Sequence, residues 1–166
     1  MWLRSITCLT LIAGLYFMPL GPKLVASADA IQHAAGRDGI VRVPSTYSLE
    51  ETLSRVKADI AAKNILLFDD IDQSKLAADA GIELHPSHLI VFGNPPLGTL
   101  FITADAEAGL DWPVRLLVYQ DDKGKVWMAY SDFQWIAKRH RISNRKKEFN
   151  MAAAVIASIV SSAEEK

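Results

Sequence analysis

The chain has 166 residues, of which 50% are apolar and 22% charged, and its formal net charge is −1. This composition is typical of one globular domain and excludes a largely disordered chain. Because basic and acidic residues are balanced, we expect no nucleic-acid partner. Cys8 is the single cysteine, so an internal disulfide is excluded, and the sequence carries no common zinc-protease, nucleophile-elbow or phosphate-loop motif.

The first 28 residues predict a secretory signal peptide. Arg4 ends a short positive region, residues 6–18 are mostly apolar, and the small residues 26–28 suit a signal peptidase. We predict cleavage after Ala28 and a periplasmic or secreted protein; the alternative is an uncleaved N-terminal anchor. Cleavage removes Cys8, so the mature protein has no thiol for catalysis or metal binding.

The predicted domain begins after a small, polar linker. We place the linker at residues 29–36 and the domain at residues 37–142. Residues 40–44 predict a first strand. Ser48 and Glu51 then form a capping box, which predicts the start of an amphipathic helix.

The next segment predicts a strand and a short helix. Residues 65–68 form an apolar run, for which we expect a buried strand. Asp72 is expected to cap the short helix, and Gly81 is expected to end it in a left-handed conformation.

Another strand and helix follow. Residues 88–92 predict a compact apolar strand. The sequence Gly93-Asn94-Pro95 then predicts a helix start, because Asn is a favoured cap and Pro is favoured at the first helical position. We expect this helix to end at Gly109.

A hairpin is predicted near the end of the domain. Residues 114–120 and 125–130 have strand character, and residues 121–124 have the composition of a hairpin turn. Ser131 and Gln134 form a second capping box that predicts the next helix.

The last predicted element is a C-terminal helix within residues 143–166. Strands and helices alternate early in the chain, and a hairpin follows late. This order favours an α+β fold, with a single mixed, largely antiparallel sheet and helices packed on it.

Much of this pattern resembles the domain of unknown function 302 family. The matching strings are HLIVFGNPPLGT from His88 and LDWPVRLLVYQDDKGKVWMAYSD from Leu110, and weaker similarity runs from Ser48 to His140. The resemblance implies an α+β fold similar to the TATA-binding-protein-like group, and it implies dimers. It implies no established reaction.

Two short segments depart from the family pattern. Many relatives have Asp-His before the short helix, where this chain has Asp72-Gln73. They also have Leu-Arg-Pro before the third strand, where this chain has Leu84-His85-Pro86. A family site that used that His and that Arg would here have lost the first and weakened the second.

The predicted helix start is the main candidate for a binding site. Gly93, Asn94 and Pro95 precede backbone N–H groups that favour an anion, and Thr99 and His85 are candidate additional donors. The alternative is that the same three residues only initiate the helix.

Two histidines and three acids form a second candidate site. His85 and His88 invite a metal interpretation, but positions three apart in a strand point to opposite faces, so we expect no metal. Asp69, Asp70 and Asp72 are a candidate acid–base or cation cluster; the alternative is a solvated turn that caps a helix.

A basic cluster lies between the last two predicted helices. Its members are Lys138, Arg139, Arg141, Arg145, Lys146 and Lys147. It suits anionic lipid headgroups, but a solvated junction between helices is favoured. Three tryptophans are expected in the core: Trp112, Trp127 and Trp135.

The preferred functional hypothesis is an exported, non-catalytic module that acts as a homodimer, binds a small ligand or a partner chain, and needs no cofactor. Any anionic ligand is expected at the helix start from Gly93 to Thr99. One alternative is a small hydrolase-like enzyme with His85 or His88 as general base. Another is a membrane-surface module held by the basic cluster.

Overall fold

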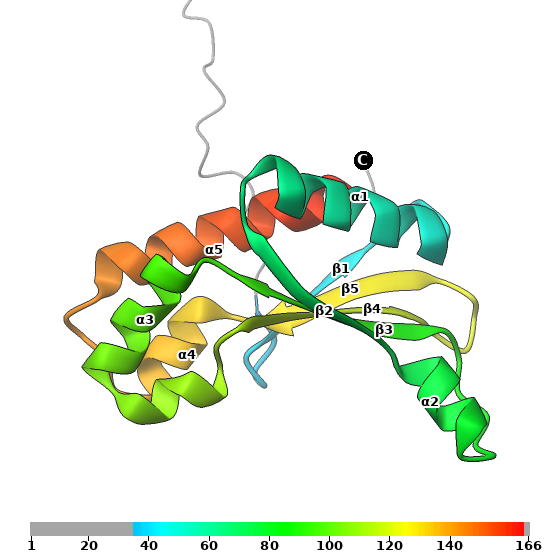
Figure 1. The fold of residues 1–166 in the computed structure, drawn as a ribbon, viewed down its shortest axis with the longest axis horizontal. Helices are drawn as coiled ribbons and strands as arrows, with labels where there is room; N and C mark the ends of the chain where they lie inside the picture. Colours follow the sequence, from blue (N-terminus) through cyan, green and yellow to red (C-terminus); the bar gives the residue numbers. More distant parts are fainter. Residues whose placement is uncertain (1–34, 165–166) are drawn as a thin grey trace, which may run out of the picture. The chain divides into compact units, whose positions relative to one another are not determined.

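The computed structural model describes residues 35–164 (Figure 1). The predicted signal peptide, its cleavage after Ala28 and most of the linker at residues 29–36 lie outside these residues. Among the helices of the described range, none combines the length and apolar character needed to cross a membrane.

In the part of the chain that the structure describes, five strands form one sheet in the order β1-β5-β4-β3-β2. Their bounds are β1 (Ile40–Pro44), β2 (Leu66–Asp72), β3 (Ser87–Gly93), β4 (Val114–Gln120) and β5 (Val126–Ser131). All four neighbouring pairs are antiparallel, including the predicted hairpin of β4 and β5. With its helices the sheet gives the expected α+β fold; within the described residues it contains none of the parallel pairing expected of a mixed sheet.

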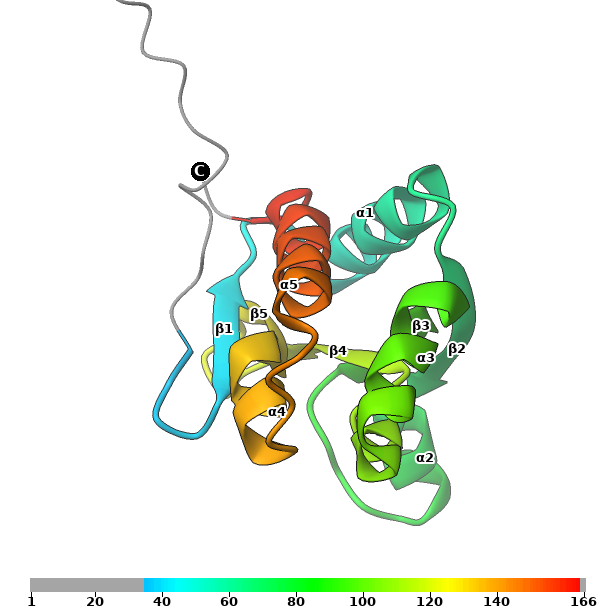
Figure 2. The ribbon, with the colours of Figure 1, turned by 90° about the vertical axis from the view of Figure 1, so that its left-hand side faces the viewer.

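Within residues 35–164, five α-helices accompany the sheet. They are α1 (Leu49–Ala62), α2 (Gln73–Asp79), α3 (Pro95–Ala104), α4 (Phe133–Arg139) and α5 (Lys146–Ser161). Helices α1 and α5 lie on the same side of the sheet (Figure 1). Because β3 and β5 run in the same direction, α3 and α4 follow them at one end of the sheet, whereas α2 follows β2 at the other (Figures 1 and 2).

Side-chain caps start most of these helices where the sequence predicts them. The side chains of Ser48, Asp72 and Asn94 each accept a hydrogen bond from the backbone N–H three residues later. Helix α4 differs by one residue, because the cap is Asp132 rather than Ser131: its carboxylate accepts the Trp135 N–H at 2.7 Å. Ser and Asp are both favoured at the N-cap position, and in α4 the carboxylate of Asp132 occupies it.

Helix α3 ends earlier than predicted. It stops at Ala104 rather than at Gly109, because Asp105 adopts an extended conformation and starts a short 3-10 helix, η2 (Ala106–Leu110). The Asp105 carboxylate accepts the N–H of Glu107 at 2.9 Å. A capping side chain inside an apolar run has therefore divided one predicted helix into two.

The prediction of a buried strand at residues 65–68 is wrong. Leu66, Leu67 and Phe68 are 44–53% exposed, because β2 is an edge strand with a sheet neighbour on one side alone. The strand also continues through the acidic segment to Asp72, so this segment is not the solvated turn of the alternative interpretation. A continuous apolar run does not distinguish a central strand from an exposed edge.

Helix α5 is an integral part of the core. Phe149 is 1% exposed, and its ring stacks on Phe101 of α3 with the centroids 4.3 Å apart. Phe133 of α4 packs against both rings. Three helices from separate parts of the chain therefore meet at one aromatic cluster.

Replacing Phe149 tests the contribution of this cluster to stability. We expect Phe149→Ala to lower the free energy of unfolding by about 3–5 kcal/mol, because it leaves a large cavity in the core. Met151→Ala, on the same helix but 47% exposed, is the matched control and should cost much less. If urea denaturation showed equal losses of unfolding free energy for the two variants, the proposed contribution of the aromatic cluster to stability would be wrong.

Candidate functional site

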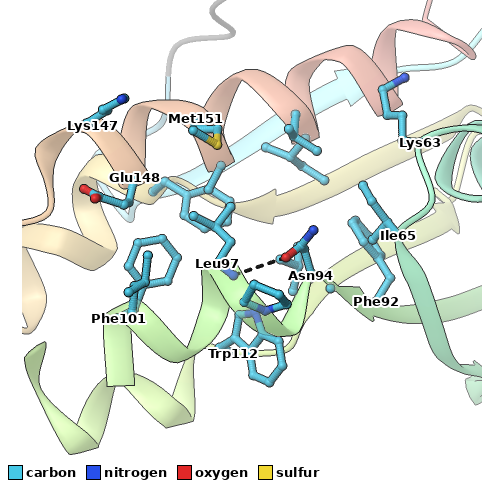
Figure 3. Close-up of a pocket in the computed structure, with 18 residues that line it drawn as sticks. Lys63, Ile65, Phe92, Asn94, Leu97, Phe101, Trp112, Lys147, Glu148 and Met151 are labelled. Atoms are coloured by element: carbon cyan, nitrogen blue, oxygen red, sulfur yellow. Dashed lines mark hydrogen bonds between the residues drawn. The ribbon is translucent and has the colours of Figure 1, made fainter. Parts of the chain in front are cut away.

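A cavity of about 680 Å³ lies between α3, α5 and the adjoining end of the sheet (Figure 3). Its walls are mainly apolar and come from strands and helices that are distant in sequence. Representative residues are Phe92, Leu97, Trp112, Met151 and Val155. This volume is within the range of about 300–1,000 Å³ that is typical of small-molecule sites.

Trp112 forms one wall of the cavity by packing against two glycines. A Cβ atom at Gly98 would lie 2.0 Å from the indole ring, and one at Gly93 would lie 3.1 Å from it. The indole also contacts Phe68 edge to face, with the ring centroids 5.9 Å apart. The close approach of Trp112 to α3 therefore depends on the absence of a side chain at Gly98.

The start of α3 offers no free backbone donors for an anion in its first turn. Pro95 and Pro96 have no N–H group, and the Leu97 N–H is taken by the Asn94 side chain at 3.1 Å. The Gly98 N–H donates to the Asn94 carbonyl at 2.9 Å. The predicted helix start is correct, but the donors on which the predicted anion site depended are absent or occupied.

A few polar groups remain around the apolar cavity. The Asn94 amide nitrogen has no hydrogen-bond partner among residues 35–164. Lys63 and Lys147 lie at opposite ends of the row of lining residues, and Glu148 lies near Lys147 (Figure 3). Lys63 pairs with Asp59, whereas Lys147 forms no ion pair within the described part of the chain.

Thr99 and His85 do not join this cavity. The Thr99 hydroxyl donates to the carbonyl of Pro95 in its own helix at 2.8 Å. His85 precedes β3, whereas Gly93 ends that strand, so the two residues lie at opposite ends of it. The ring of His85 instead lies 3.4 Å from Asp122.

The predicted acidic cluster meets one of the two histidines. His88 Nδ1 lies 2.8 Å from Asp70 Oδ1, and its Nε2 lies 3.9 Å from Asp72 Oδ2. Lys57 of α1 binds the second oxygen of Asp70. Asp69 takes no part in this contact, and its carboxylate accepts the N–H of Asp70. The group lies at the β2–β3 pair, and none of its members lines the cavity.

Hydrogen bonds to Asp70 change its acidity. Partial burial favours the neutral carboxyl, but the hydrogen bonds from Lys57 and His88 favour the carboxylate more strongly, so the pKa of Asp70 is below its usual value. Asp70 therefore accepts hydrogen bonds from both neighbours as an anion at neutral pH.

The basic cluster is divided among different contacts. Arg139 reaches Asp111 at 3.3 Å and lies over the Trp135 ring, and Arg145 donates to the carbonyl of Leu100. Lys147 lines the cavity. Within residues 35–164, the remaining three form no ion pair: Lys138, Arg141 and Lys146. Charges that are adjacent in sequence therefore have different surroundings.

The tryptophans are not in the core as expected. Trp135 is 37% exposed, and Trp112 and Trp127 are only partly buried. The Trp127 indole N–H donates to Asp121 at 2.9 Å in the hairpin turn. The sequence indicates the apolar neighbours of Trp112 correctly but does not predict the cavity that this residue lines. The one local signal is Gly98 inside a predicted helix, where the missing side chain allows the indole to approach.

Among the curated proteins, the chain is similar to segments of longer ones. It is 39% identical over 104 residues to "Fluoride-specific ion channel FluC 1" of Brucella suis biovar 1 (strain 1330), covering 63% of this chain and 41% of the relative. It has the same identity over 104 residues, 63% of this chain, to "Fluoride-specific ion channel FluC 2" of Brucella melitensis biotype 1 (strain ATCC 23456 / CCUG 17765 / NCTC 10094 / 16M), covering 38% of it. The chain thus spans about two fifths of these relatives.

A solved structure and a family model give broader matches. The crystal structure of an uncharacterized conserved DUF302 protein from Bacillus stearothermophilus has a TM-score of 0.69 and 13% identity, covering 76% of this chain and 98% of that one. At this identity the match establishes the fold. The model of "Domain of unknown function DUF302" matches residues 41–161, so it includes α5. The chain belongs to the DUF302 family.

Proposed function

We propose that this protein is a non-catalytic module that binds a small ligand with an apolar body and one anionic end. The observation that carries the proposal is the apolar cavity of about 680 Å³ between α3 and α5. Most known ligand pockets combine such walls with a few polar groups that fix the orientation of the ligand.

The polar groups around the cavity favour an anion over a cation. The Asn94 amide nitrogen is a donor without a partner in the described range, and it borders the apolar space. Lys63 is already paired with Asp59, so Lys147, which forms no ion pair among residues 35–164, is the cation available in the lining. The ligand would place its apolar body against Trp112 and its anionic end toward Lys147.

We also propose that two copies associate through β2. This strand ends the sheet order, and Leu66 and Leu67 expose 53% and 44% of their surface along it. Exposed apolar edge strands pair readily with other chains. A second copy related by a two-fold axis would cover the same strand on both partners, and β1 would become the edge at each end of the joined sheet.

The enzyme alternative rests on the contact between His88 and Asp70. A carboxylate that orients an imidazole is a common arrangement for a general base. However, Asp70 also binds Lys57, and the group does not line the large cavity. We therefore favour a structural role in which these residues attach α1 to the edge of the sheet.

The membrane-surface alternative rests on the basic cluster. Arg139 and Arg145 are engaged with Asp111 and with the carbonyl of Leu100, which leaves fewer charges for lipid headgroups. We therefore favour ligand binding over electrostatic attachment to a membrane.

The anionic dye 1-anilinonaphthalene-8-sulfonate tests the ligand proposal. We expect saturable fluorescence enhancement, with dodecanoate competing for the dye. Met151→Trp should weaken dye binding at least tenfold by filling the cavity mouth. Ala154→Trp, on an exposed position of α5 outside the lining, is the matched control and should bind as the wild type does.

Two further probes separate apolar from anionic recognition. Dodecanol should compete at least tenfold more weakly than dodecanoate, because it lacks the charge that Lys147 attracts. Fluoride, the ion in the name of the Brucella relatives, should not displace the dye. Equal dye binding by both Trp variants would refute the proposed site, and equal competition by the alcohol would refute the anionic end.

The mass of the protein in solution tests the proposed dimer. Light scattering coupled to size exclusion should give twice the chain mass at micromolar concentration for the wild type and the monomer mass for Leu66→Lys. Leu110→Lys replaces a 67%-exposed leucine away from β2 and should remain dimeric. A wild-type monomer would contradict the proposal.

The structural role of Asp70 predicts a pH dependence. Its folded pKa lies below its unfolded pKa, so its stabilising effect is present above about pH 4 and is lost as the pH falls through the folded pKa. Lys57→Met should therefore cost about 0.5–1 kcal/mol of unfolding free energy at pH 7 and less at pH 2.5.

The control for this experiment is Lys75→Met, whose partner Asp79 and own side chain are both more than 60% exposed. That variant should change stability little at either pH. A cost at Lys57 that does not decrease in acid would show that lost packing, rather than the charge of Asp70, explains the effect.

A further inference from the structure

We propose that Asp105, Glu107 and His140 form a binding site for a divalent transition-metal ion, with Zn²⁺ as the best match. One ligand atom from each side chain lies within 4.8 Å of the other two. Because zinc ligands lie about 2.0–2.2 Å from the ion, the ligand atoms of a tetrahedral site are about 3.3–3.6 Å apart. Binding an ion would therefore require the two carboxylates to rotate toward His140 and bring the three atoms up to about 1.5 Å closer together.

The buried imidazole is the strongest indication of a ligand. The side chain of His140 is 5% exposed, and its Nε2 lies 2.6 Å from Asp111 Oδ2. A hydrogen bond from Nε2–H to this carboxylate leaves a lone pair on Nδ1, which has no partner among residues 35–164. Metal-binding histidines usually donate their second ring N–H to a carboxylate in this way.

The charges around His140 leave two carboxylates available. Asp111 is 5% exposed and is reached by Arg139 at 3.3 Å and by Arg115 at 3.6 Å. Neither guanidinium pairs with Asp105 or Glu107, and within the described residues these two acids form no ion pair. One oxygen of Asp105 accepts the Glu107 N–H, which leaves its second oxygen for a cation.

The donor set indicates the class of metal. One imidazole nitrogen and two carboxylate oxygens suit Zn²⁺ and its first-row neighbours better than Mg²⁺, which prefers oxygen ligands alone. Three protein ligands leave a fourth position for water. Glu107 is exposed, so an ion can enter from solvent, and none of the three residues lines the apolar cavity.

Zn²⁺ titration of the untagged, chelator-treated protein tests this site. Calorimetry should give one ion per chain, and the melting temperature should rise with ion concentration. Asp105→Asn and Glu107→Gln should each weaken Zn²⁺ binding at least tenfold. Both variants should fold, because Asn is as good a helix cap as Asp and Glu107 is exposed.

A control variant and the absorption spectrum of bound Co²⁺ distinguish binding at this site from binding elsewhere on the protein. Asp122→Asn removes a carboxylate that is 98% exposed and outside the cluster, and it should leave Zn²⁺ binding unchanged. Asp111 is a positioning residue, so Asp111→Asn should weaken binding about 10–100-fold and shift the visible absorption of bound Co²⁺. Absence of one-to-one binding, or binding unaffected by both ligand variants, would overturn the proposal.

Discussion

The stacking of Phe101 on Phe149 fixes α3 against α5, and much of the rest of this end of the molecule depends on it. With the ring centroids 4.3 Å apart, the two helices are in contact at this point. Beyond it they border the cavity, which Trp112 closes on the side of α3. The cavity thus exists because two close contacts, one aromatic and one onto glycine, hold α3 between α5 and the indole.

Sheet topology explains why these elements meet. Strands β3 and β5 are separated by β4 and run in the same direction, so the helices after them leave the sheet at the same end. Helix α5 then returns across the sheet on the side of α1 (Figure 1). Segments that are far apart in sequence, around Phe92, Trp112 and Met151, therefore face a single space.

Local signals explain which parts of the fold could be predicted from the sequence. The caps at Ser48, Asp72 and Asn94, the left-handed Gly81 and the hairpin turn each depend on residues within a few positions of one another. Each such contact is specified by a few neighbouring residues and does not depend on how distant segments pack. The acidic cap Asp132 shows the limit, because two adjacent residues were both able to cap.

Features that depend on distant segments could not be predicted in the same way. The run at Leu66 to Phe68 has the composition of a buried strand, and its exposure follows from its place at the sheet edge. The two prolines of α3 were visible in the sequence, and they could have ruled out the anion site at its first turn. The contact between Asp111 and His140 joins residues 29 positions apart, and no periodicity points to it.

The proposed metal site and the cavity share a structural connection. Asp105 ends α3, which forms one side of the cavity, and Asp111, which binds His140, directly precedes the wall residue Trp112. An ion bound by Asp105, Glu107 and His140 would tie η2 and the end of α3 to the C-terminal end of α4. Trp112 is packed against Gly98 of α3, so the segment that carries the metal ligands also carries this part of the cavity wall. The two proposed sites are thus joined by one short segment, although no residue is common to both.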